Sequence, residues 1–69
     1  MTNKETVRLY LNEELKDSIR SSFNLTQMSK DSGIELDDLT LALKLLVMDR
    51  IISVFEQENP DEVFIELQL

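Results

Sequence analysis

Carboxylates are the side chains of this sequence that could do chemistry, because the chain holds 14 Asp and Glu but no histidine and no cysteine. Two adjacent acidic pairs stand out, Asp37-Asp38 and Asp61-Glu62. Neighbouring residues on a helix point in different directions, so such a pair does not form a general acid–base site. The stretch DSGIELDD lacks the alternating oxygen ligands and the terminal Glu of a calcium loop. We therefore expect no enzyme activity, no metal site and no cofactor.

The charge balance favours a protein partner. Seven Lys and Arg face the 14 acids, which gives a net charge of −7. An acidic field repels nucleic acid and anionic membrane surfaces and attracts basic proteins. The longest apolar run, Leu45–Met48, is too short to cross a membrane. The lack of cysteine fits a reducing compartment, and we expect one cytoplasmic domain over residues 1–69.

The longest predicted helix begins at residue 35 or 36 and ends at residue 49 or 50. At 100° per residue, Leu39, Leu43, Leu46 and the stem of Arg50 share one stripe of this helix. We expect this inner stripe to pack on apolar side chains from the rest of the chain. They are Leu15, Ile19, Phe23, Leu25, Met28 and Ile34.

Leu41, Leu45 and Met48 form a second apolar stripe on nearly the opposite side of the same helix. Charged residues border this second stripe, namely Asp37, Asp38, Lys44 and Asp49. Two interpretations stay open. Either residues 2–11 or the C-terminal segment cover the stripe, or it is an exposed patch for a protein partner or a second copy of the chain.

The N-terminal segment is ambiguous. TVRLYLN alternates like a strand, whereas Thr2 and Glu5 form a capping box for one long helix from about Asn3 to Phe23. We favour a helix over Leu15–Phe23 with Asn12 as an N-cap, and treat residues 1–11 as an arm of undecided structure.

The rest of the chain shows clearer boundaries. Asn24 caps a short helix that Gly33 ends, so residues 12–50 are expected to be helical. The alternating segments IISVFEQ and EVFIELQL flank the turn residues Asn59-Pro60-Asp61. Residues 51–69 are therefore predicted to form a β-hairpin.

This order of elements resembles the winged helix-turn-helix superfamily. The residues that carry the resemblance are Met28-Ser29, KDS, Gly33-Ile34, the aliphatics Leu39, Leu43 and Leu46, and the pair Ile51-Ile52 that opens the wing. The resemblance implies an α+β domain of three helices with a C-terminal β-hairpin wing, a fold that serves both DNA readers and protein-binding modules.

Several positions depart from the pattern of the DNA-reading members. Arg50 stands where many members carry Gly before the wing, and Glu35, Asp37 and Asp38 occupy the capping and base-reading region. The hairpin adds four further acids where a DNA-binding wing needs bases, namely Glu56, Glu58, Asp61 and Glu62.

We therefore expect a protein-binding regulatory or adaptor module, acting in transcription or replication control and able to form a homodimer. Its predicted contacts are Leu41, Leu45 and Met48 with a rim of Asp37, Asp38 and Asp49. The alternative is a DNA-binding transcription regulator that reads DNA through Leu36, Thr40 and Lys44. A third hypothesis is an acidic mimic that occupies a nucleic-acid-binding protein.

A shorter resemblance covers about twenty residues at the N-terminus. TVRLYLNEELKDSI is similar to the ribbon-helix-helix repressors, in which the outward residues of a paired strand read the major groove. Arg8 and Tyr10 would be those residues here. This interpretation leaves the C-terminal hairpin unexplained, so it ranks second.

Overall fold

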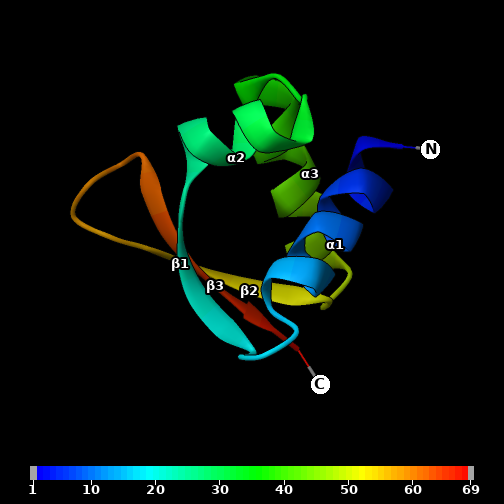
Figure 1. Cartoon of the computed structure of the whole chain (residues 1–69), viewed down its shortest axis with the longest axis vertical. Coiled ribbons are helices and arrows are strands. Elements are labelled where there is room, and N and C mark those ends of the chain that lie inside the picture. Colours follow the sequence, from blue (N-terminus) through cyan, green and yellow to red (C-terminus); the bar gives the residue numbers. More distant parts are fainter. Residues whose placement is uncertain (1, 69) are drawn as a thin grey trace.

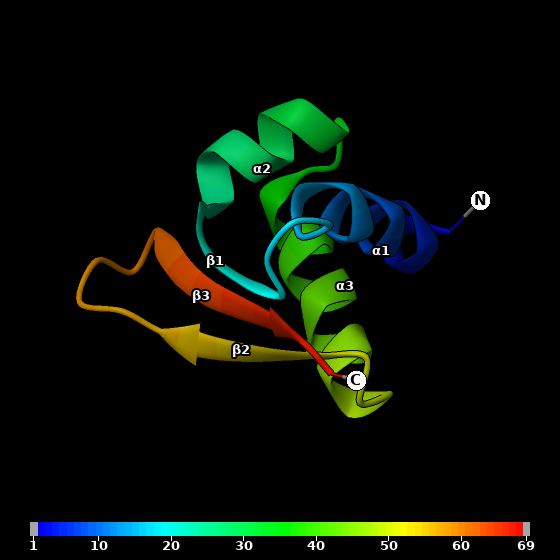
Figure 2. The same cartoon turned by 60° about the horizontal axis from the view of Figure 1, so that its bottom comes forward.

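The computed structural model describes residues 2–68 of the 69-residue chain. Its elements are α1 (Asn3–Glu14), β1 (Arg20–Asn24), α2 (Leu25–Ser32), α3 (Leu36–Met48), β2 (Ile52–Glu56) and β3 (Glu62–Leu67). The strands form one antiparallel sheet in the order β1-β3-β2, and the helices gather on one side of it (Figures 1 and 2). The described chain is a small α+β domain in which β3 is the central strand.

Side-chain caps fix where the first two helices begin. The amide of Glu5 donates to Thr2 Oγ1 at 3.2 Å, and the amide of Gln27 donates to Asn24 Oδ1 at 2.9 Å. Each cap satisfies an amide that the helix itself leaves without a partner. Gly33, with φ of 73°, ends α2 in the left-handed conformation that glycine adopts without steric cost. The cap predicted at Asn24 and the stop at Gly33 are confirmed, and in the undecided N-terminal segment the structure has the helix with the Thr2 cap rather than the strand.

The predicted helix over Leu15–Phe23 is wrong, and so is the N-cap at Asn12, which lies inside α1. Residues 20–24 form β1 instead and pair with β3, with Phe23 opposite Val63 and Arg20 opposite Glu66. Two serines make this segment a weak helix former, and pairing with a distant strand decides its conformation. The hairpin is consequently not a wing on its own, because a strand that precedes α2 completes its sheet.

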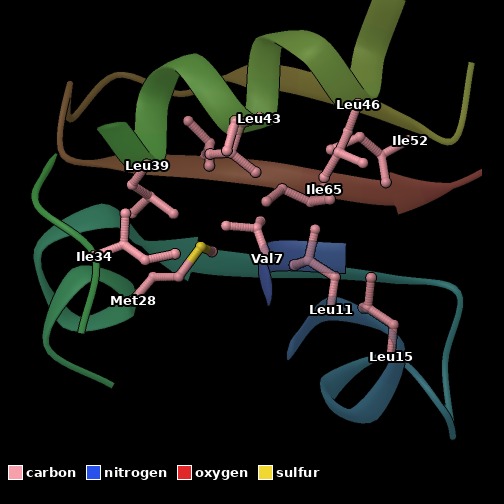
Figure 3. Close-up of a cluster of buried hydrophobic side chains, with 12 residues drawn as sticks. Val7, Leu11, Leu15, Met28, Ile34, Leu39, Leu43, Leu46, Ile52 and Ile65 are labelled. Atoms are coloured by element: carbon pink, nitrogen blue, oxygen red, sulfur yellow. The ribbon is translucent and has the colours of Figure 1, made fainter. Parts of the chain in front are cut away.

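One apolar core lies between the helices and the sheet (Figure 3). The predicted inner stripe of α3 is confirmed for Leu39, Leu43 and Leu46, all of which are buried. Two other assignments to this interface are wrong. Ile19 lies in the α1–β1 connection and is 45% exposed, and Arg50 lies beyond the end of α3 with an exposed side chain.

The predicted turn of the hairpin is also present. The amide of Glu62 donates to the carbonyl of Asn59 at 3.0 Å, and the amide of Asp61 donates to Asn59 Oδ1 at 2.9 Å. The side chain of Asn59 thereby holds the turn that Pro60 preorganises. The β2–β3 loop projects beyond the helices in both views (Figures 1 and 2).

A Schellman motif ends α3. The amide of Arg50 donates to the carbonyl of Val47, and the amide of Ile51 donates to the carbonyl of Leu46, both at 3.0 Å. This geometry requires a left-handed residue after the cap, which is usually glycine. Arg50 occupies it with φ of 61° and is the one non-glycine residue of positive φ in the described range 2–68.

We expect Arg50→Gly to stabilise the protein. A non-glycine residue in the left-handed region costs on the order of 1 kcal/mol, and glycine removes that strain at a small entropic cost. The free energy of unfolding, measured by urea titration, should rise by up to about 1 kcal/mol. Arg50→Ala is the matched control, because it removes the same side chain but keeps a Cβ, and it should give no increase. Equal stability of the two variants would show that the left-handed conformation of Arg50 is not strained.

Candidate functional site

The second stripe of α3, Leu41, Leu45 and Met48, is exposed on the surface, and we refer to it as the ridge. The exposed fractions of these side chains are 56%, 39% and 71%. α1 packs on the core through Val7 and Leu11 and does not cover the ridge. Of the two interpretations of this stripe, the exposed patch is therefore the one that agrees with residues 2–68. That the ridge contacts a partner stays a prediction.

Carboxylates stand at both ends of the ridge. Asp37 and Asp38 are exposed in the first turn of α3, where they also stabilise the helix through its dipole. Asp49 follows the last turn and forms an ion pair with Lys4 of α1. This pair ties α1 to the end of α3, and it makes Asp49 a less available rim residue than Asp37 or Asp38.

The residues predicted to read DNA fall into two groups. Leu36, Thr40 and Lys44 are exposed on α3, and the Thr40 hydroxyl donates to the carbonyl of Leu36 at 2.8 Å. Arg8 and Tyr10 lie on α1, a helix, so the prediction of a DNA-reading ribbon is wrong. The Thr2 cap and the burial of Val7 and Leu11 select the helix over the strand at this segment.

Tyr10 has an internal role. Its ring centroid lies 6.5 Å from that of Phe23, and its hydroxyl donates to Asp31 Oδ2 at 3.3 Å. Partial burial raises the pKa of Tyr10 above 10.0, and the charges of Glu14 and Asp31 and the hydrogen bond to Asp31 raise it further. Tyr10 thus connects α1 to β1 and α2. Its ring and hydroxyl are engaged within the protein and are not available to contact DNA bases.

A groove lies between α3 and the β2–β3 hairpin and has a volume of about 630 Å³. Its floor is apolar, with Leu43 and Val47 from α3 and Val54 and Val63 from the two strands. Its hairpin side carries Glu residues. Sequence reasoning missed the groove, because only the packing of the hairpin against α3 brings these residues together.

The outer face of the sheet carries a second apolar surface. Phe55 and Phe64 are directly opposite each other on β2 and β3, and both are exposed. The guanidinium carbon of Arg20 lies 5.5 Å from the ring centroid of Phe64, a cation–π distance. The alternation of the two strands places both phenylalanines on one face and could have indicated this pair.

The basic side chains come from many different elements of the chain. They are distributed over all three helices, β1 and two connections, namely Lys4, Arg8, Lys16, Arg20, Lys30, Lys44 and Arg50. Lys4 pairs with Asp49 and Lys16 with Glu13. A DNA-binding surface depends on clustered bases that neutralise phosphates, and two of these seven bases are already paired with carboxylates of the chain.

Residues 2–68 contain no buried charged or polar residue and no group of three or more carboxylates placed to hold a metal ion. In the same range no helix is long and apolar enough to span a membrane. What the surface offers is apolar area beside carboxylates.

No protein-family model matches the chain, and comparisons with curated proteins and with solved structures gave no significant match. The surfaces of this molecule must therefore be interpreted from its own geometry.

We expect the tyrosine absorbance of the protein to titrate above pH 10, and the chain holds a single tyrosine, so the assignment is direct. Since the folded state favours the neutral phenol, the stability that Tyr10 contributes is present below pH 10 and is lost as the pH rises through the raised pKa. Asp31→Asn should shift the pKa of Tyr10 back toward 10, whereas Asp37→Asn should leave it unchanged. An ordinary pKa in the wild type would rule out the Tyr10–Asp31 contact.

Proposed function

We propose that this chain is a winged-helix protein-binding module that contacts its partner through the ridge and acts as a regulatory or adaptor factor. The order α1-β1-α2-α3-β2-β3 supports the winged-helix assignment, with α2, the turn at Gly33 and α3 as the helix-turn-helix. Transcription or replication control is the setting that the fold analogy suggests.

The observation that carries the proposal is the exposure of Leu41, Leu45 and Met48 on one helix. Isolated apolar side chains are normal on a surface, but three at helical spacing form a contiguous patch. Such a patch with a polar border is the usual anatomy of a protein–protein contact. A stripe on a helix can also pack against the same stripe of a second copy, so a homodimer is the first partner to test.

Electrostatics support polypeptide over nucleic acid as the partner. Asp37 and Asp38 stand at the start of α3, where a DNA-reading helix approaches phosphates and bases. The hairpin segment 51–69 contains no Lys or Arg. A net charge of −7 repels the phosphates and opposes the gain from counterion release that favours DNA binding.

Leu45→Glu tests the ridge, and Leu9→Glu is the matched control, because Leu9 is a 55% exposed leucine on α1 outside the ridge. In sedimentation equilibrium the wild type and Leu9→Glu should dimerise at high protein concentration. Leu45→Glu should stay monomeric with an unchanged far-UV circular dichroism spectrum, because a buried carboxylate in the contact would need to be desolvated.

Three results would count against the ridge. Loss of structure in Leu45→Glu would make Leu45 a residue of the fold. Equal dimerisation of all three proteins would place the contact elsewhere. A wild type that stays monomeric would reject the homodimer. The ridge would then be tested by capturing host proteins with wild-type and Leu45→Glu baits. Capture of the same proteins by both baits would count against the ridge as the contact.

The rival function, direct DNA binding, makes the opposite prediction for labelled duplex DNA. We expect no salt-sensitive binding at low ionic strength, where any electrostatic contact is strongest. A steep decrease of affinity with salt, abolished by Lys44→Gln, would favour the DNA-binding alternative over the proposal. Lys30→Gln is the control of equal charge on α2.

A further inference from the structure

The groove between α3 and the β2–β3 hairpin has an apolar floor that the chain itself leaves partly open. Val47 is 40% exposed, and Val54 and Leu25 are half-buried. The volume of about 630 Å³ is within the range of pockets that enclose a ligand or a bulky side chain. The groove is on the hairpin-facing side of α3, and none of the three ridge residues lines it.

The charges around the groove are unequal on its two walls. Glu56, Glu58 and Glu62 line the hairpin wall, and Lys44 lines the α3 wall. The ion pairs of residues 2–68 involve none of these four groups. An occupant therefore meets three carboxylates on one side of an apolar floor and one ammonium on the other. Polyanions and acidic peptides are repelled, whereas a cationic segment is attracted.

We propose that this groove binds a cationic amphipathic peptide segment of a partner protein. One aliphatic or aromatic side chain of the segment occupies the floor formed by Val47, Val54 and Val63, and its Lys or Arg side chains face Glu56 and Glu58. The inference rests on the protein-binding function proposed above and adds a second contact surface to it, on the other side of α3 from the ridge.

A tryptophan-containing peptide can test the groove directly, because the protein has no tryptophan and the emission then reports the peptide alone. The probe is a short capped peptide of alternating lysine and serine with one central tryptophan. We expect a saturable blue shift of its emission on titration with the protein. Replacing its tryptophan by serine, or its lysines by glutamates, should abolish binding in a competition assay.

Protein variants can distinguish binding in the groove from a general attraction of the cationic peptide to the negative net charge of the protein. Glu56→Gln combined with Glu58→Gln should weaken peptide binding about fivefold, as two exposed charge pairs would. Glu13→Gln combined with Asp17→Asn changes the net charge equally outside the groove and should leave the affinity within about twofold. Val47→Lys puts a lysine side chain over the floor at an exposed helical position and should abolish saturable binding. Circular dichroism of each variant verifies its fold.

Amide chemical-shift mapping decides where the peptide binds. Shifts concentrated at Val47, Val54 and the hairpin would support the groove. Shifts at Leu41 and Leu45, or equal weakening by the two double variants, would overturn it while leaving the ridge proposal intact. Absence of binding by the wild type would also overturn it. Retained binding by Leu45→Glu together with its loss in Val47→Lys would show that the groove works independently of the ridge.

Discussion

α3 has more apolar side chains than the single core can bury, and this surplus determines which apolar surfaces the protein exposes. Nine of its 13 residues are apolar, and only Leu39, Ala42, Leu43 and Leu46 can face the single core of so short a chain. Of the remaining five, Leu41, Leu45 and Met48 form the ridge, Val47 lies in the wall of the groove, and Leu36 is exposed at the start of the helix. The carboxylates beside both surfaces are the reason for proposing polypeptide rather than phosphate as the partner.

Local rules predicted α2 and α3. The cap at Asn24, the stop at Gly33 and the period of α3 depend on residues within a turn of each other, whereas at α1 the cap signal of Thr2 competed with the alternation of a strand and left the segment undecided. The boundary between α1 and β1 was not predictable in this way. Ile19 and Phe23 continue a four-residue spacing, but Phe23 pairs with Val63 of β3, some forty residues further along the chain, and the Ile19 carbonyl accepts from the amide of Leu67.

The candidate surfaces show the same division. The ridge follows from 100° per residue on one helix, so its place on the side opposite the inner stripe could be predicted, whereas its exposure depended on where residues 2–11 and the hairpin lie. The groove could not be predicted, because Val47 and Val54 meet only once the hairpin has packed against α3. The Phe55–Phe64 pair was predictable in part. The alternation of each strand shows which face of the sheet a phenylalanine occupies, but only the register between β2 and β3 shows that the two are opposite each other. The ion pair of Lys4 with Asp49 had no local indication at all.

The position of β3 in the sheet has a consequence for biogenesis. The middle strand is the last of the three to leave the ribosome, so β1 and β2 lack their native pairing partner until β3 has been synthesised. A nascent chain can form its helices early, but it holds β1 as an open, unpaired segment until β3 arrives between the two outer strands. Premature termination upstream of β3 would therefore leave a helical fragment without a sheet to close its core.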